Sequence, residues 1–467
     1  MKTLKIMKKL PLLLAVVLLS FSCSNDDDNN NPMVEPQELN IVETAQATAD
    51  LSILVDAVVQ AGLVDALTAT GNKTVLAPTN AAFTTYLADK GFNSLSEVPN
   101  DVLTQILLNH VIAGSNITSS ELAGTAGYTS TLADGPNSTK MSIYYNGTSG
   151  VIFNGVASVA IPDVETSNGI VHVIDAVIDL PSIVTFATAD PNFSTLVSAL
   201  TELTPSTDFV SVLQGEGPFT VLAPVNDAFA ALPAIPGEDD LTQILLNHVV
   251  GGAISSTDLV GLGSGYANTL ATGPGDNYLS LYFDATDGVS FNGAANVAVA
   301  DVVAINGIIH AIDGVITLPT IATFATANPA LSILVDALAY ADTGTPTVPY
   351  IETVSDATAG PFTVFAPTND AFVDVLGELN LTALTDLTTD QVDTVLLYHI
   401  VGANVQSSGL PNGTVAALGG NLTADNTAFT LTDPNDRVSN IVTSLVDIQG
   451  INGVVHVIDK VILFPLN

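Results

Sequence analysis

The sequence has little positive charge, one cysteine and no tryptophan. Nine Lys and Arg stand against 47 Asp and Glu, which gives a formal net charge of −38. Nucleic-acid binding needs clustered Lys and Arg to neutralise phosphates, so this composition argues against that class of partner. A single cysteine rules out a disulfide scaffold. The absence of tryptophan removes the commonest platform for stacking against sugar rings.

The few positive charges gather at the N-terminus, where they indicate a targeting signal. Four lysines within the first nine residues precede a short apolar segment at 10–21, which is below the ~20 residues needed to span a bilayer. The only cysteine, Cys23, follows directly after Ser22. This pattern resembles a bacterial lipoprotein signal. The resemblance implies a signal peptide at 1–22, cleavage before Cys23 and lipidation of its thiol, the alternative being an ordinary secretory peptide.

Residues 23–36 are expected to form an acidic tether. They include the run Asp26 to Asp28, and no apolar residue occurs between Cys23 and Pro32. An acidic run after a lipidated cysteine resembles the surface-export signal of Bacteroidetes-type lipoproteins. It implies an outer membrane lipoprotein exposed at the cell surface, the alternative being a tether that faces the periplasm. No later stretch approaches 18 uninterrupted apolar residues, so the lipid is the only membrane anchor that the sequence predicts.

The rest of the chain is one unit that occurs three times. A block of the form Thr-Val-x-Ala-Pro-x-Asn-x-Ala-Phe occupies 74–83, 220–229 and 363–372. A helical block that ends near a histidine occupies 105–111, 243–249 and 394–400. An Asn-Gly-x-x-His-x-Ile-Asp block occupies 168–175, 306–313 and 452–459. A period of about 145 residues is the size of a domain, which predicts domains at 37–180, 181–320 and 321–467 with almost no linker.

Each unit is expected to begin with helices and to end with strands. Helical spacing of apolar residues at 51–59 and after Pro99 predicts two helices, and residues 74–77 predict a short buried strand. In the second helix Val102, Leu103, Ile106 and Leu107 are expected to form the buried stripe. Asn-Gly pairs at 146–147 and 154–155 predict hairpin turns before a long final strand at 170–178. The asparagine of the first block is placed to N-cap the following helix. These asparagines are Asn80, Asn226 and Asn369. This order favours an α+β domain.

The three blocks together resemble the fasciclin domain family. They match the two signatures of that family and the helix between them, in the same order in each unit. The resemblance implies three tandem domains, each a β-wedge or sandwich with packed α-helices. It also implies a role in cell adhesion or extracellular matrix contact rather than an enzymatic activity, and we expect no cofactor.

Each unit contains two histidines, which admit two interpretations. They are His110 and His172, His248 and His310, and His399 and His456. One hypothesis is a paired metal or acid–base site in each unit. The other is a hydrogen-bonded core histidine, which the shared strand face of Ile170, His172 and Ile174 favours. A zinc site needs three or four converging ligands, so we expect no metal.

A Tyr-His pair in the third unit, Tyr398-His399, matches the adhesion motif of the family. The resemblance associates that motif with integrin contact in animal relatives. The first two units carry Asn109 and Asn247 in place of the tyrosine. The apolar residues that flank Tyr398 also fit a helix residue packed against the wedge.

The sequence therefore predicts a lipid-anchored cell-surface adhesion protein. The acidic residues spread evenly, 14, 14 and 15 per unit, as on a solvated surface. The expected partners are surface proteins or glycans of other cells or matrix, and repulsion between acidic copies predicts a weak dependence on calcium. The main alternative is a glycan- or ligand-binding lipoprotein that assists polysaccharide capture. A hydrolase with an unrecognised site and a passive envelope spacer stay open.

Overall fold

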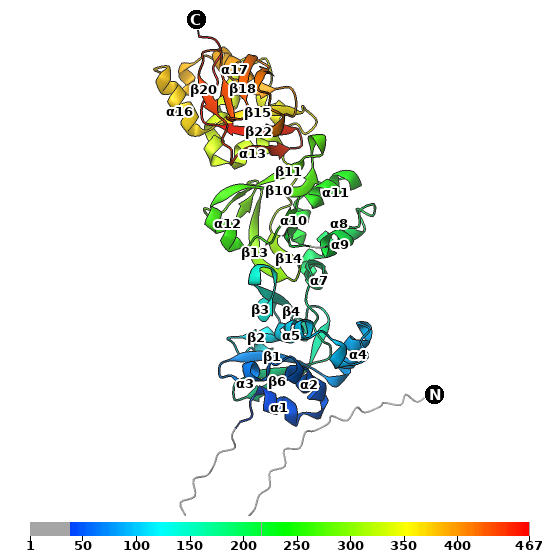
Figure 1. The fold of residues 1–467 in the computed structure, drawn as a ribbon. Coiled ribbons are helices and arrows are strands. Elements are labelled where there is room, and N and C mark those ends of the chain that lie inside the picture. Colours follow the sequence, from blue (N-terminus) through cyan, green and yellow to red (C-terminus); the bar gives the residue numbers. More distant parts are fainter. Residues whose placement is uncertain (1–37, 216, 467) are drawn as a thin grey trace, which may run out of the picture. The chain divides into compact units, whose positions relative to one another are not determined.

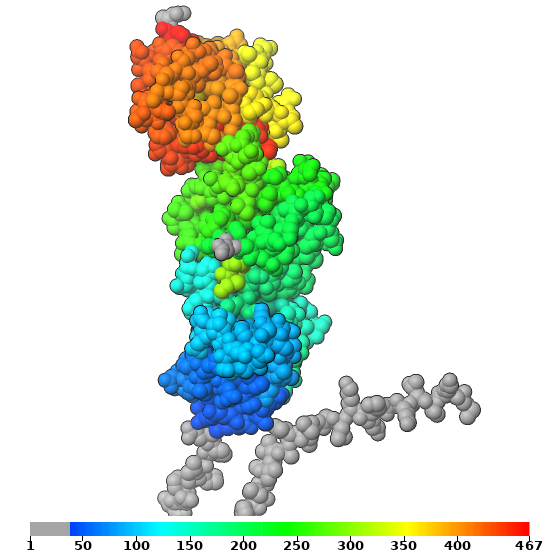
Figure 2. Space-filling model, turned by 45° about the vertical axis from the view of Figure 1, so that its right-hand side comes forward, coloured from blue at the N-terminus to red at the C-terminus, as the bar shows by residue number. Residues whose placement is uncertain are grey.

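The computed structural model describes residues 38–466 except residue 216, so the predicted signal peptide, Cys23 and the tether lie outside the described residues. Three repeats follow one another along the chain, coloured blue to cyan, green, and yellow to red (Figure 1). The space-filling view shows the same three repeats by their colours (Figure 2). All three combine helices with β-sheet, so the predicted α+β class is confirmed.

In the first repeat the helices are α1 (Ile41–Ala47), η1 (Ala49–Leu51), α2 (Ser52–Gln60), α3 (Val64–Thr68), α4 (Asn80–Asp89), η2 (Leu95–Glu97), α5 (Asn100–Asn109), α6 (Ser119–Leu122) and η3 (Pro136–Ser138). Its strands are β1 (Lys73–Pro78), β2 (Val111–Ala113), β3 (Ala126–Asp134), β4 (Lys140–Asn146), β5 (Ile152–Phe153), β6 (Ala157–Thr166) and β7 (Gly169–Ile174). They form one sheet in the order β2-β1-β7-β6-β5-β4-β3.

The second repeat has the helices α7 (Ile183–Ala189), η4 (Pro191–Phe193), α8 (Ser194–Thr201), α9 (Phe209–Gln214), α10 (Asn226–Ala230), α11 (Glu238–Leu246), α12 (Ser256–Leu262) and η5 (Pro274–Asp276). Its strands are β8 (Phe219–Pro224), β9 (Val249–Gly251), β10 (Ser264–Thr272), β11 (Tyr278–Asp284), β12 (Ser290–Phe291), β13 (Ala295–Ala304) and β14 (Gly307–Ile312). Their order matches that of the first repeat, and pairing of β10 with β9 closes them into a barrel.

The third repeat has the helices α13 (Ile321–Ala327), η6 (Pro329–Leu331), α14 (Ser332–Asp342), α15 (Tyr350–Ser355), α16 (Asn369–Glu378), η7 (Leu384–Asp386), α17 (Thr389–Leu397) and η8 (Ser407–Gly409). Its strands are β15 (Phe362–Pro367), β16 (Ile400–Val401), β17 (Gly413–Ala417), β18 (Gly420–Asp425), β19 (Thr430–Thr432), β20 (Val438–Asn440), β21 (Ile448–Gly450) and β22 (Gly453–Ile458). They form two four-stranded sheets, β16-β15-β22-β21 and β17-β18-β19-β20.

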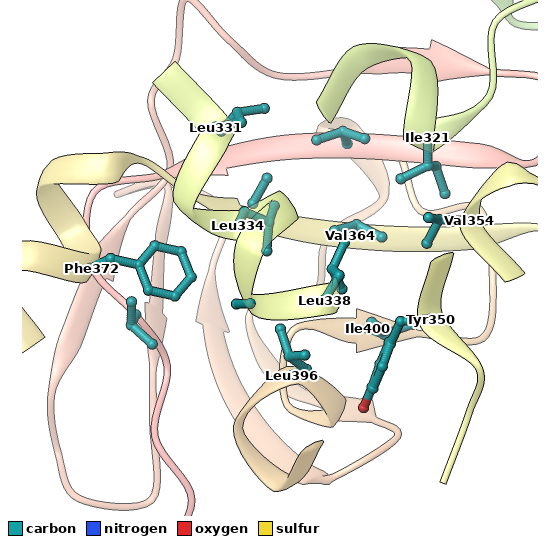
Figure 3. Packing of buried hydrophobic residues seen from close by; sticks show 14 of the residues in the cluster. Ile321, Leu331, Leu334, Leu338, Tyr350, Val354, Val364, Phe372, Leu396 and Ile400 are labelled. Carbon is teal, nitrogen blue, oxygen red and sulfur yellow. The ribbon is translucent and has the colours of Figure 1, made fainter. Parts of the chain in front are cut away.

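The parallel strand pair at the centre of each repeat separates two apolar cores. In the first repeat β1 and β7 are buried along their whole length. Successive side chains of a strand point to opposite faces. Val75 and Val171 therefore pack with the helices on one face, while Leu76 and Ile174 pack with the antiparallel strands on the other. In the third repeat Leu334 and Leu338 of α14, Val364 of β15 and Leu396 of α17 meet in the helical core (Figure 3).

Two local predictions need correction. The final strand was expected to reach Ile178, but β7 ends at Ile174. Beyond it the Ile178 amide donates to a histidine nitrogen of the α5 end instead of to a neighbouring strand. In α5, Leu103, Ile106 and Leu107 are buried as predicted, because their spacing places them on one face of the helix. Val102 lies beside that face and is 39% exposed, so its predicted burial is wrong.

The joins between repeats carry equivalent hydrogen bonds. The Ile305 amide donates to the Pro181 carbonyl and the Ile451 amide to the Pro319 carbonyl, both at 2.8 Å. The hydroxyl of Ser142 accepts from the Val303 amide at 2.9 Å. The hydroxyl of Ser280 accepts from the Gln449 amide at 3.0 Å. Ser142 of the first repeat and Ser280 of the second thus anchor backbone of the following repeat.

Candidate functional site

The first histidine of each repeat fastens a helix end to the segment after the last strand. His110 lies just after α5, and its Nδ1 is 2.7 Å from the Ile106 carbonyl oxygen. Because a carbonyl only accepts, Nδ1 carries the proton and Nε2 accepts from the Ile178 amide at 2.9 Å. The equivalent acceptor and donor residues are Ile244 and Ile316 for His248, and Val395 and Ile462 for His399.

These three rings are held in the neutral form. His110, His248 and His399 are each 2% exposed. Burial lowers the pKa of each imidazole from 6.5 to about 4, against the opposing effect of the hydrogen bond to the helix carbonyl. Both ring nitrogens are engaged with backbone, which is the arrangement of a structural histidine.

The second histidine of each repeat holds a strand bulge against the start of a short helix. The Nε2 of His172 donates to the Ile117 carbonyl at 2.8 Å, and its Nδ1 accepts from the Asp163 amide at 3.2 Å. Asp163 has a positive φ of 56°, and its carboxylate accepts from the amide and hydroxyl of Ser119 at the start of α6. The same pattern joins His310 with Asp301 and Ser256, and His456 with Asp447 and Ser407.

The two histidines of a repeat do not share a site. In each repeat both rings direct their nitrogens to separate backbone groups, as described above. Across residues 38–466, residue 216 aside, no group of three or more His, Cys, Asp and Glu side chains could hold a metal ion. Each of these rings is hydrogen-bonded to backbone groups in the interior, which is what the hypothesis of a hydrogen-bonded core histidine describes.

The predicted N-cap role of Asn80, Asn226 and Asn369 is wrong. The N-cap of α4 is Thr79, whose hydroxyl accepts from the Ala82 amide at 3.2 Å. Asn80 is already inside the helix, so its side chain points away from the α4 amides and caps α2 across the fold. It accepts from the Ile53 amide at 2.9 Å and donates to the Ala49 carbonyl at 3.1 Å. Asn226 binds Thr195 and Pro191, and Asn369 binds Ile333 and Pro329, in the same way.

This bridge gives a testable difference between neighbouring residues. Asn80→Ala removes the hydrogen bonds that the side chain makes to the Ile53 amide and the Ala49 carbonyl. We expect this substitution to destabilise the first repeat by about 2 kcal/mol. Thr79→Ala removes an ordinary cap and is expected to cost about 1 kcal/mol. Hydrogen exchange of the Ile53 amide should accelerate in the first variant alone. Equal acceleration in both would mean that Asn80 does not cap α2.

Another set of asparagines, which the sequence interpretation did not assign, fixes the first helix of each repeat. Asn168 accepts from the Ile41 amide at 3.0 Å and donates to the Leu67 carbonyl at 2.8 Å. Asn306 accepts from the Ile183 amide at 3.0 Å, and Asn452 from the Ile321 amide at 2.9 Å. The recurrence of Asn-Gly in the third block was the signal that could have revealed them.

The Tyr-His pair of the third repeat lies in the interior. Tyr398, directly after α17, is 7% exposed and packs in the apolar core between the two sheets. Its ring lies against Gly419 and Gly420, which leave no room for a side chain. In the first repeat Asn109 occupies this position and its side chain bonds the Thr131 hydroxyl and the Asp179 carbonyl. The closed fold therefore presents neither Tyr398 nor His399 to a partner.

No helix among the described residues could cross a membrane by itself. Between residues 38 and 466, without residue 216, no one helix is both long and apolar enough. The pair Ile321–Ala327 and Pro329–Asp342 meets the length and composition criteria together but is bent by 102°.

Comparison with known proteins gives the class of these repeats. Residues 49–181, 191–319 and 330–464 each match the model of the Fasciclin domain. Protein sll1483 of Synechocystis sp. is 41% identical over 174 residues, which cover 35% of this chain and 89% of that protein. Human periostin is 25% identical over 440 residues, which cover 91% of this chain and 47% of periostin.

A solved structure shows a weaker likeness. It is described as "a FAS1 Domain Pair from the Insect Cell Adhesion Molecule Fasciclin I", with 21% identity and a TM-score of 0.37 over 57% of this chain and 96% of that chain. The family rests on the sequence matches, which cover more than half of the chain. The chain belongs to the fasciclin domain family, with three tandem domains.

The helices α1, α7 and α13 start before the matched ranges, yet each is fixed to its own repeat by the asparagines described above.

Proposed function

We propose that the chain is a lipid-anchored cell-surface protein that mediates adhesion or interaction through its three fasciclin domains. The observation that carries this proposal is the presence of three complete copies of one domain, each fastened by the same histidine and asparagine contacts. Three similar faces on one molecule raise avidity through effective concentration, without a single strong site. In this function the chain binds partners and does not turn over a substrate.

Anchoring and exposure are tested on intact cells that produce the full chain. We expect protease and antibody to reach the wild type at the cell surface. Cys23→Ala should release the protein from the membrane, and replacement of Asp26 to Asp28 should leave it lipidated but hidden. Protection of the wild type until the outer membrane is opened would contradict surface exposure and favour a periplasmic role.

The acidic surface predicts a response to divalent cations. Between Lys140 and Arg437 the sequence has no Lys or Arg, so the whole second repeat is without a basic side chain. Neighbouring copies therefore repel one another, and bound or screening cations weaken that repulsion. We expect cell–cell attachment to increase between chelator and millimolar calcium. Equal attachment in the two conditions would show that attachment does not depend on calcium.

Glycan capture is the second candidate, and one hollow where the first repeat meets the start of the second favours it. The hollow has a volume of about 510 Å³, and its lining includes Tyr86, Asp89, Asp175 and Asp179. Carboxylates accept hydrogen bonds from hydroxyl groups, and an aromatic ring offers an apolar face. Saturable binding of one defined glycan to the full chain, lost in Asp89→Ala, would favour this candidate over protein-mediated adhesion.

A further inference from the structure

The third repeat contains an apolar cavity that the proposed adhesive function does not use. Its volume is about 240 Å³, and it lies between α16, α17 and residues 461–466. Phe372, Val375 and Leu379 line it from α16 and the residue after it, and Leu463 lines it from the C-terminal segment. Gln391 is the only polar residue of the lining. A cavity of this chemistry prefers apolar carbon to water.

Comparison with the first repeat shows why this space is open and apolar. Counted from the shared motif phenylalanines Phe83 and Phe372, Val375 occupies the position of Tyr86. Two further substitutions follow the same count. Leu381 takes the position of Phe92, and Leu379 that of Lys90.

Counted from the second histidine, Leu463 takes the position of Asp179. In the first repeat Lys90 and Asp179 form an ion pair at 2.5 Å, and the Tyr86 hydroxyl donates to Asp179. The third repeat replaces these polar groups and large rings with smaller aliphatic side chains.

The rim of the cavity carries the only two Lys or Arg residues in 141–467, Arg437 and Lys460. Arg437 binds Glu378 at 2.6 Å, Asp433 at 3.0 Å and the Val461 carbonyl at 2.7 Å, so its guanidinium is fully engaged. Lys460 directly precedes Val461 of the lining, and its Nζ is 3.8 Å from Glu378. This long contact, at a lysine side chain 36% exposed, leaves the ammonium able to turn toward an anionic group.

We infer that this cavity binds the alkyl chain of a fatty acid, with the carboxylate at Lys460. A cavity of ~150 Å³ lined by Leu, Ile and Phe takes up benzene, so 240 Å³ accommodates a longer apolar group. The lining comes from α14, α16 and α17, the segment at 379–387 and the C-terminal segment, and a flexible linear chain can follow such a surface. The scarce positive charge at the rim matches a single anionic head group in a chain that is otherwise strongly acidic.

The cavity is tested by displacement of a fluorescent apolar probe from the full chain carrying Cys23→Ala, so that its own lipid does not compete. Fatty carboxylates of increasing length, below their micellar concentrations, should bind one per chain. Each added methylene should lower Kd by roughly fourfold until the cavity is filled. Absence of saturable displacement, or an affinity independent of chain length, would overturn the inference.

Two sets of variants separate the cavity from the surface. Val375→Tyr with Leu381→Phe rebuilds the first repeat's side chains inside the cavity and should weaken binding at least tenfold. Val373→Tyr is the matched control, because Val373 is 60% exposed on the same helix, and it should bind as the wild type does. Binding retained by the cavity-filled variant would place the ligand elsewhere and overturn the assignment.

The position of the carboxylate is tested by a substitution at the rim that leaves the cavity lining unchanged. Lys460→Met should weaken decanoate binding about fivefold and leave decanol binding unchanged. Wild-type protein should prefer decanoate to decanol, and decanol to a decyl-trimethylammonium cation. The reverse order would contradict a carboxylate at Lys460. A variant that loses cell attachment but still binds decanoate, or one that loses decanoate binding but still attaches, shows that the cavity and the adhesive function are separate.

Discussion

Gly169→Ala is expected to unfold the first repeat, and Gly307→Ala and Gly453→Ala to unfold the second and third. A Cβ atom at Gly169 would lie 2.3 Å from the Lys73 carbonyl oxygen of the neighbouring parallel strand. At Gly307 and Gly453 the distance to the equivalent carbonyl oxygen is 2.2 Å. These oxygens belong to the buried central strand and cannot move aside cheaply. We expect each substitution to cost more than about 3 kcal/mol, a large part of the stability of one domain.

A glycine in open space provides the matched control. Gly261 lies in α12 of the second repeat, and a Cβ atom there would meet nothing within 4 Å. Gly261→Ala should stabilise that repeat by up to about 1 kcal/mol through helix propensity. Calorimetry of the full chain, with hydrogen exchange to identify the repeat that unfolds, measures both effects. An unchanged unfolding profile for Gly307→Ala would show that the two strands do not approach as described.

Acidification is expected to destabilise all three repeats between pH 6.5 and pH 4. Burial lowers the pKa of His110, His248 and His399 from 6.5 to about 4, so the unfolded chain binds more protons than the folded chain in this interval. The contribution of each neutral histidine to the free energy of unfolding is fully present above pH 6.5 and is lost as the pH drops toward 4. This contribution amounts to about 3 kcal/mol for each repeat.

A single substitution tests whether His110 causes the pH dependence of the first repeat. Gln can donate from its amide nitrogen and accept at its oxygen, as the neutral imidazole of His110 does, but it does not titrate. In His110→Gln the first repeat should lose most of its pH dependence above pH 4, while the second and third repeats keep theirs. Urea unfolding at a series of pH values, followed by hydrogen exchange in each repeat, measures this slope. An unaltered slope in the first repeat would contradict the assignment to His110.

The repeated blocks allowed the fold class and the three domains to be predicted, because the spacing of apolar residues follows directly from helix and strand geometry. The strand at Thr74 and the buried face of α5 at Leu103 and Ile106 followed in this way. The family match adds the tertiary arrangement that periodicity alone does not contain.

The contacts that fasten each repeat could not be read from local sequence. Asn80 was assigned to its own helix because an N-cap depends on nearby residues, whereas its actual partners, Ala49 of η1 and Ile53 of α2, come from earlier helices. The same holds for Asn168, whose partner at Ile41 is distant in sequence. Local rules recognise a polar residue in a suitable position, but they do not identify a partner that only folding brings near.

The cavity of the third repeat illustrates the same limit. Val375 and Leu379 have an ordinary apolar helical spacing, which predicts burial and not empty space. Only the side chains that face them from α17 and the C-terminal segment determine the remaining volume.

Joint action of the three fasciclin domains in adhesion is tested most directly by attachment under flow. Cells displaying the full chain would be compared with cells displaying variants in which Gly169→Ala, Gly307→Ala and Gly453→Ala disable one, two or all three repeats, at equal surface amounts. Attachment should fall steeply with each disabled repeat and should be lost when all three are disabled. Attachment that persists in the triple variant, or depends on the lipid and tether alone, would contradict it.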